Sequence, residues 1–231
     1  MRTNKVVKLA AAIALFNASL AQALPYENRI ISLDGRQFFV GDVPRENSDS
    51  DIWFYFRQSP WLGELVRNDS VLSDQDVRFL RTGIPANDLV DGINRRNVGL
   101  DPYIETDPRY TANGYYVYTQ GRGIFTLQPH SSKLNYSISC ILNSVDGPFS
   151  LCRIRVAYPY ATHIALTSNE FFPGPMSEIA HEFEPIAQRM IEIAICLDVT
   201  DQTDAERAQF ETKTLLENPT LTNCRTAQQT S

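Results

Sequence analysis

The sequence predicts a single α+β domain: an antiparallel β-meander with short helices before it, a C-terminal helical pair packed on it, and two disulfides. Three observations support this fold class. Helix-capping residues cluster between residues 59 and 99, alternating apolar and polar residues dominate from 103 to 167, and an apolar stripe at helical spacing begins at Ile179. Because helices and strands are segregated along the chain, a parallel sheet of β-α-β units is not expected.

The part of the chain before residue 100 is predicted as one hairpin followed by helices. Residues 28–41 form the hairpin, with its turn at Asp34-Gly35. The aromatic run 51–57 is too short for its periodicity to distinguish helix from strand. Three short helices follow, marked by capping residues, a proline at the first helical position and closing glycines. They begin at Ser59-Pro60, at Ser73 (ending before Gly83) and at Asn87 (ending before Gly99).

The central segment is predicted as antiparallel strands with one buried face, because apolar and polar residues alternate. Strands at 115–119 and 124–128 flank a glycine-containing tight turn, and another strand covers 161–167. Between them, 135–143 and 149–156 flank a short loop that ends in glycine, as three-residue hairpin loops require.

The four cysteines after residue 24 suggest a disulfide framework in an oxidising compartment. Centring the last hairpin on Asp146 places Cys140 opposite Cys152, at a separation that a disulfide can span. Cys196 and Cys224 then form the second predicted pair, since the chain after the last helix is long enough to return. The absence of a C-x-x-C spacing argues against redox chemistry and zinc.

The C-terminal region is predicted to contain a long helix and a shorter one. The long helix carries an apolar stripe that keeps its phase across Pro185, so we expect a kink there instead of a break. A capping box at Thr203 and Glu206 starts the second helix, over 204–217, and 225–231 form a loose tail. The stripe consists of Ile179, Phe183, Ile186, Met190, Ile193 and Leu197.

The first 23 residues are typical of a cleavable signal peptide. A basic start precedes the apolar stretch Leu9–Leu20, and Ala21-Gln22-Ala23 supplies a small-x-small cleavage site. Cleavage after Ala23 would release residues 24–231 as a soluble protein, secreted or periplasmic. No later apolar run reaches the length of a membrane span, so no membrane anchor is expected.

The charge balance excludes nucleic acid as a partner. The whole chain has 21 basic and 27 acidic residues, and the leader contains three of the basic and none of the acidic ones. The exported domain would therefore have a formal charge of −9, and its largest basic cluster is Arg95-Arg96. Such a surface does not attract phosphate backbones.

No catalytic signature is present, so the sequence predicts no catalytic residue, no metal ligand and no cofactor. His181-Glu182 begins like a zinc-protease helix, but Pro185 stands where the second histidine is required. One alternative is an extracytoplasmic hydrolase in which His130, His163 or His181 acts with an acid and a Ser or Thr.

A second alternative is a calcium-stabilised envelope protein. Acidic residues cluster between the last two predicted helices, and calcium takes oxygen ligands from such loops. Acidic residues at a helix start are equally expected from the helix dipole. The cluster consists of Asp198, Asp201, Asp204 and Glu206.

The tyrosines predict a binding function. Eight of the ten lie between Tyr103 and Tyr160, and on one strand Tyr116 and Tyr118 share a face opposite Tyr115. Exposed tyrosines can stack on sugar rings or grip a protein, so we predict that Tyr115, Tyr116 and Tyr118 contact a protein or glycan partner. The plainer interpretation is that tyrosine favours strands, half-buried with its hydroxyl in water.

Overall fold

The fold is given by a computed structural model of the chain. The predicted signal peptide 1–23, Cys224 and the predicted tail 225–231 lie outside the described residues. No helix in the described ranges is long and apolar enough to span a membrane. The structure describes residues 29–43, 52–72, 75–95, 114–119, 124–142, 149–172, 174 and 176–207.

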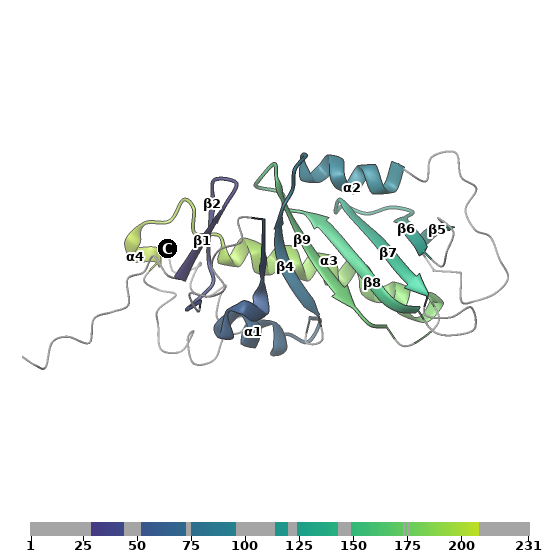
Figure 1. Cartoon of the computed structure of the whole chain (residues 1–231), viewed down its shortest axis with the longest axis horizontal. Helices are drawn as coiled ribbons and strands as arrows, with labels where there is room; N and C mark the ends of the chain where they lie inside the picture. The colour runs from purple at the N-terminus through teal and green to yellow at the C-terminus, as the bar shows by residue number, and fades with distance from the viewer. Residues whose placement is uncertain are drawn as a thin grey trace, which may run out of the picture.

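A seven-stranded antiparallel sheet in the order β3-β4-β9-β8-β7-β6-β5 forms the body of the molecule (Figure 1). Its strands are β3 (Trp53–Tyr55), β4 (Asp76–Arg81), β5 (Tyr115–Thr119), β6 (Ile124–Pro129), β7 (Tyr136–Leu142), β8 (Phe149–Ala157) and β9 (Ile164–Glu170). A separate hairpin pairs β1 (Ile30–Leu33) with β2 (Arg36–Phe39). The helices are the 3-10 helix η3 (Phe56–Gln58), α1 (Pro60–Arg67), α2 (Ala86–Arg95), α3 (Met176–Leu197) and α4 (Asp204–Arg207).

The predicted α+β class and antiparallel meander are confirmed. Strands β5 to β9 follow one another along the chain and pair in that order. Cys140 lies opposite Cys152 in the β7–β8 register, and the two form a disulfide with a Cα–Cα distance of 4.0 Å. Both half-cystines are fully buried, so the crosslink forms part of the core.

Helix α3 covers one face of the sheet and closes the main core, and it lies behind the sheet in Figure 1. All six residues of the predicted apolar stripe are buried. On the sheet, Cys152, Ile154 and Val156 of β8 point toward the same core. The helix continues through Pro185, as the unbroken phase of the stripe predicted.

Helix α2 packs on the opposite face and covers only one end of it (Figure 1). Ala86 and Val90 of α2 are buried against Ala157 and Ala165 of the sheet. These small side chains allow the helix to approach the strands closely. We call this side of the sheet, which points away from α3, the open face.

The hairpin predicted at 28–41 is confirmed. Its turn residues have positive φ, 46° at Asp34 and 76° at Gly35, which is the left-handed conformation that two-residue hairpin turns need. The hairpin lies beside the C-terminal end of α3, where the backbone N–H of Val199 donates to the carbonyl of Gln37 at 2.8 Å.

The helix predicted to begin at Ser73 is wrong, because this part of the chain forms strand β4. Val77 and Phe79 point into the core, whereas Asp76 and Arg78 alternate with them toward the open face. This two-residue period favours a strand, and pairing to β9 stabilises it. Together they outweigh the helix-capping residues on which the predicted helix was based. The other two predicted helices are present as α1 and α2, and the ambiguous aromatic run becomes β3 and η3.

The C-terminal predictions are confirmed in part. Only four residues of the predicted helix 204–217 are described, as α4, and 208–217 lie outside the described residues. Of the two predicted disulfides, Cys140–Cys152 lies within the described residues and is found. Cys196 is buried in α3 and no described cysteine is free, but Cys224 lies outside the described residues. The Cys196–Cys224 pair therefore stays a prediction.

Candidate functional site

A cleft of about 670 Å³ lies between the outer surface of α3 and the β5–β6 edge of the sheet. Its volume falls within the range of small-molecule binding sites, about 300–1,000 Å³. Side chains that can donate or accept hydrogen bonds line much of it. They include Tyr115, His130, Ser131, His181, Glu184 and Gln188.

Helix α3 provides one wall of the cleft. His181, Glu184 and Gln188 are spaced by three and four residues, so they form a single exposed stripe along the helix. Pro185 lies in the same wall and has no N–H, so the carbonyl of His181 lacks its usual helical donor. This wall therefore offers a carboxylate, an amide, an imidazole and a backbone acceptor.

Two tyrosine hydroxyls lie deeper in the cleft. The hydroxyls of Tyr115 and Tyr136 are 2.8 Å apart and hydrogen bonded, and the Tyr115 ring packs edge-on against Phe183. Burial raises the pKa of both phenols, and the nearby Glu184 carboxylate adds to this effect. Both phenols are therefore neutral at physiological pH and able to donate or accept a hydrogen bond.

The turn after β6 closes the other wall. The hydroxyl of Ser132 donates to Oε1 of Glu184 at 2.9 Å and accepts from the backbone N–H of Leu134 at 3.0 Å. This link ties the turn to α3. His130, at the start of this turn, lines the same cleft as His181.

The three tyrosines of the sequence prediction have different environments. Tyr116 and Tyr118 share the open face, as predicted, and Tyr115 points to the opposite side into the cleft. Only Tyr116 is well exposed, at 45 %, whereas Tyr118 is 8 % exposed. The Tyr116 ring contacts the His130 ring with centroids 4.2 Å apart, so it lies next to the rim of the cleft.

The structure brings two of the three histidines together. His130 and His181 both line the cleft, whereas His163 lies in the turn between β8 and β9, where its backbone N–H donates to Asp34. Within the described part of the chain, neither cleft histidine is hydrogen bonded through its ring to an acid or a hydroxyl. Among the same residues, no group of three or more His, Cys, Asp or Glu side chains could hold a metal ion.

The acidic cluster considered as a calcium site contains a structural ion pair. The side chain of Asp198 is 5 % exposed and accepts hydrogen bonds from Arg36, Tyr158 and Thr200. Burial alone would raise the pKa of Asp198, but these hydrogen bonds outweigh burial and hold the pKa below its ordinary value. Asp198 thus fixes the β1–β2 hairpin to the end of α3.

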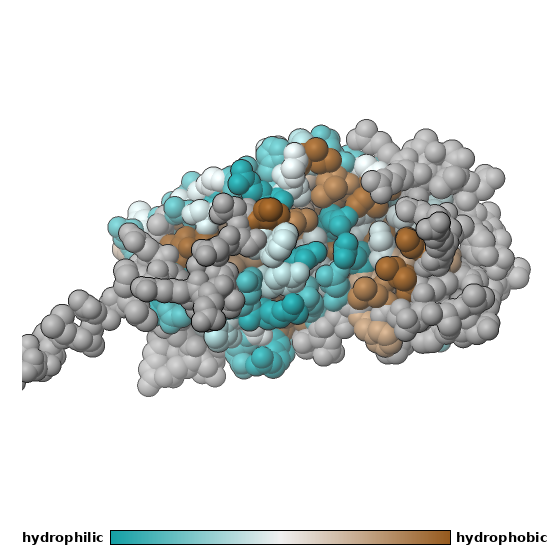
Figure 2. All heavy atoms as spheres, viewed as in Figure 1, coloured by the Kyte–Doolittle hydropathy of each residue, from teal (hydrophilic) through white to brown (hydrophobic). Residues whose placement is uncertain are grey.

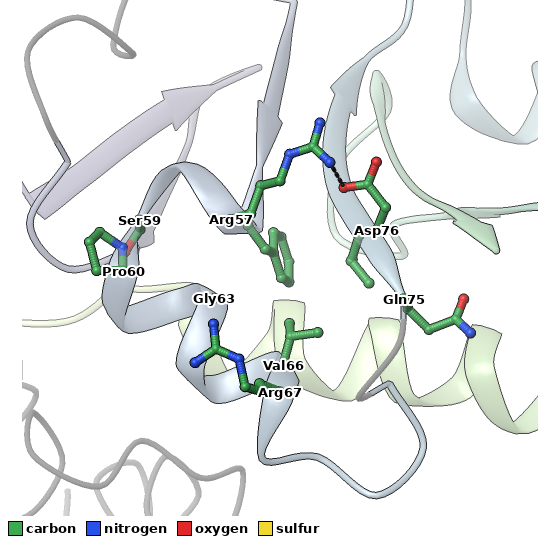
Figure 3. A pocket seen from close by; sticks show the side chains of 10 residues that line it. Arg57, Ser59, Pro60, Gly63, Val66, Arg67, Gln75 and Asp76 are labelled. Carbon is green, nitrogen blue, oxygen red and sulfur yellow. Dashed lines mark ion pairs between the residues drawn. The ribbon is translucent and has the colours of Figure 1, made fainter. Parts of the chain in front are cut away.

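A second, smaller pocket of about 210 Å³ lies between η3, α1 and β4 (Figure 3). Arg57 points across it toward Asp76, with 3.0 Å between the charged atoms, and Arg67 pairs with Glu64. Helix α1 packs closely on η3 here, since a Cβ at Gly63 would lie 3.5 Å from the Cα of Arg57, an ordinary van der Waals contact. Since both arginines are paired within the protein, we take the larger cleft as the candidate site.

Compared with protein families, curated proteins and solved structures, the chain matches none. Sequence reasoning identified Tyr115, His130 and His181 but missed Glu184 and Gln188. The signal was available on α3, because these two residues share one helical stripe with His181. Nothing in the sequence indicated that the turn after β6 would lie over that stripe.

Proposed function

We propose that the protein is an exported binding domain whose cleft takes a short glycan. The observation that carries this proposal is the composition of the cleft walls. Neutral hydroxyls of Tyr115 and Tyr136, the Gln188 amide and the Glu184 carboxylate offer donors and acceptors for sugar hydroxyls. At the rim, the exposed ring of Tyr116 provides a surface on which a sugar ring can stack.

The export part of the proposal rests on residues 1–23 and on the cysteines. A buried disulfide between Cys140 and Cys152 is typical of proteins that fold in the periplasm or outside the cell. We propose that Cys196 and Cys224 form a second one. Mass spectrometry of the exported protein tests this, since cleavage after Ala23 and the loss of four hydrogens are both expected.

A glycan array followed by titration calorimetry tests the binding function. We expect Gln188→Ala to weaken binding of the best saccharide about tenfold, because one wall loses its amide. Tyr116→Ala is expected to weaken binding about fivefold through loss of stacking. Tyr160→Ala is the matched control, since Tyr160 is 60 % exposed but lies outside the cleft. Equal losses in all three variants, or no saccharide bound by the wild type, would contradict the proposal.

The second candidate is a hydrolase that uses the same cleft. It is favoured by one observation: His130, His181, Glu184 and Ser131 line a single cavity. Hydrogen-bond geometry in enzymes often tightens only when substrate is bound. The two candidates differ in one result, because an enzyme converts the saccharide that it binds. Product formation that is lost in both His130→Ala and His181→Ala would support the hydrolase and replace the binding proposal.

A further inference from the structure

The open face carries three arginines on two strands, β4 and β8, which lie on either side of β9. Arg78 of β4 and Arg155 of β8 both lie next to Thr167 of the intervening strand β9. Adjacent strands are about 4.8 Å apart, so the Cα atoms of these two arginines are about 10 Å apart. Arg153 is two residues before Arg155 on the same face. A positive stripe thus crosses three strands of an acidic protein.

Two of these arginines are held in place by neutral groups. The Arg78 guanidinium donates to the hydroxyls of Thr167 and Tyr55 and lies 5.1 Å from the centre of the Tyr55 ring. Arg153 donates from Nε to Oδ1 of Asn169 at 2.7 Å. Within the described part of the chain, neither Arg78 nor Arg153 forms an ion pair. The side chains of Arg78 and Arg153 are therefore oriented, and no described acidic residue neutralises their charges.

An apolar patch adjoins the arginines. Ile124, Ile141 and Leu151 are direct neighbours across β6, β7 and β8, and they are 37 %, 46 % and 40 % exposed. Leu151 is two residues from Arg153 on the same face. Figure 2 shows this side of the molecule, with apolar residues gathered toward the ends of β7 and β8 and hydrophilic residues over β4 and β9. Grouped apolar residues on a surface mark interaction sites.

The composition of this surface favours one kind of occupant. A glycan would leave the three aliphatic side chains without an apolar partner. A second copy packed face to face would bring arginine stripes together, and like charges in contact are unfavourable. A protein segment that carries both carboxylates and apolar side chains can form ion pairs with Arg78 and Arg153 and cover the exposed aliphatic side chains.

We propose that the open face binds an acidic, amphipathic segment of another protein. Carboxylates of the partner pair with Arg78 and Arg153, and its apolar side chains cover Ile141 and Leu151. This site is on the face of the sheet that points away from α3, and it is separate from the cleft between α3 and the β5–β6 edge. A failure of glycan binding therefore does not affect it.

A displayed library of random peptides, selected on the exported full-length domain, tests the proposal without assuming a partner. We expect the enriched peptides to combine Asp or Glu with Leu, Ile or Phe. Fluorescence anisotropy with the most enriched peptide should then show weaker binding at high salt, because exposed ion pairs are screened. Replacing its carboxylates by amides should weaken binding about tenfold or more.

Matched variants assign the binding to this surface. Arg153→Gln and Leu151→Ser are each expected to weaken binding about fivefold to tenfold. Arg67→Gln and Ile84→Ser are the controls, because both side chains are exposed elsewhere, at 69 % and 50 %. Both pairs keep buried packing intact, so thermal melting should be unchanged. Enrichment without acidic residues, equal losses in variants and controls, or equally tight binding of a polyuronate would each overturn the proposal.

Discussion

The two faces of the sheet differ in how far their apolar side chains are buried and their charged side chains are paired. Beneath α3, Leu166 is fully buried, and nearby the Asp198 carboxylate is matched by Arg36. On the open face, Leu151 is 40 % exposed, and the one described side-chain partner of Arg153 is the amide of Asn169. The first arrangement lowers the free energy of the folded chain by itself. The second contributes little to the stability of the folded chain. If the open face binds a partner as proposed, substitutions on the two faces should separate folding from binding.

The largest difference should come from one leucine on each face. Leu166→Ala removes a fully buried side chain and is expected to destabilise the fold by about 2–5 kcal/mol, through lost burial and a cavity. Leu151→Ala, on the adjacent strand, is expected to cost less than about 1 kcal/mol. Urea unfolding followed by circular dichroism gives both values. If both variants lost a similar free energy of unfolding, Leu151 would have to pack against another part of the folded chain.

A second comparison concerns the charged groups. Asp198→Asn is expected to destabilise the fold by about 2–3 kcal/mol, because Arg36 then lies beside a neutral amide in a partly buried site. Arg153→Gln, with neutral partners only, is expected to change stability by less than about 0.5 kcal/mol. The same urea titration measures both variants. A stability loss in Arg153→Gln as large as that in Asp198→Asn would remove the distinction between the faces.

The pH dependence of stability should follow Asp198. Its pKa is lower in the folded chain than the ordinary value of about 3.9. A lowered pKa means that the folded state binds the proton less readily, so Asp198 contributes stability above about pH 4. This contribution is lost as the pH falls through the folded pKa. In urea titrations at decreasing pH, the gap between wild type and Asp198→Asn should close below pH 4, and a constant gap would contradict this origin.

The meander and its disulfide could be predicted because their register is local. Centring a short loop on Asp146 predicted the pairing of β7 with β8, and the observed register does place Cys140 opposite Cys152. The stripe of α3 was equally local, since helical spacing alone identifies its buried residues. In both cases the information lies within about two dozen residues.

Strand β4 and the cleft could not be predicted, because both depend on distant segments. Arg78 pairs with Thr167, which is 89 residues further along the chain. The alternation of Val77 and Phe79 with polar residues was a local strand signal, but nothing local showed which strand residues 76–81 pair with. The cleft combines Tyr115 of β5, His130 after β6 and Glu184 of α3. The residues could be recognised as polar or aromatic, but their proximity is a property of the packed fold.

Removing the hydroxyl of Tyr115 or Tyr136 should destabilise the fold less than substituting Leu166 or Asp198, because these hydroxyls lie where the buried face meets the cleft. Tyr115→Phe removes one partner of a single neutral hydrogen bond and is expected to cost about 0.5–1.5 kcal/mol. Tyr136→Phe should cost a similar amount.

A double-mutant cycle tests whether the two hydroxyls act as a pair. The double variant should lose less than the sum of the single variants, since the second substitution removes a hydroxyl that has already lost its partner. Burial raises the pKa of both phenols, so their contribution is complete below about pH 10 and is lost as the pH rises further. If the two losses in urea unfolding are additive, each hydroxyl is stabilised by water in the cleft instead of by the other hydroxyl. The part of the cleft around Tyr115 and Tyr136 would then be wetter than the packed face beneath α3.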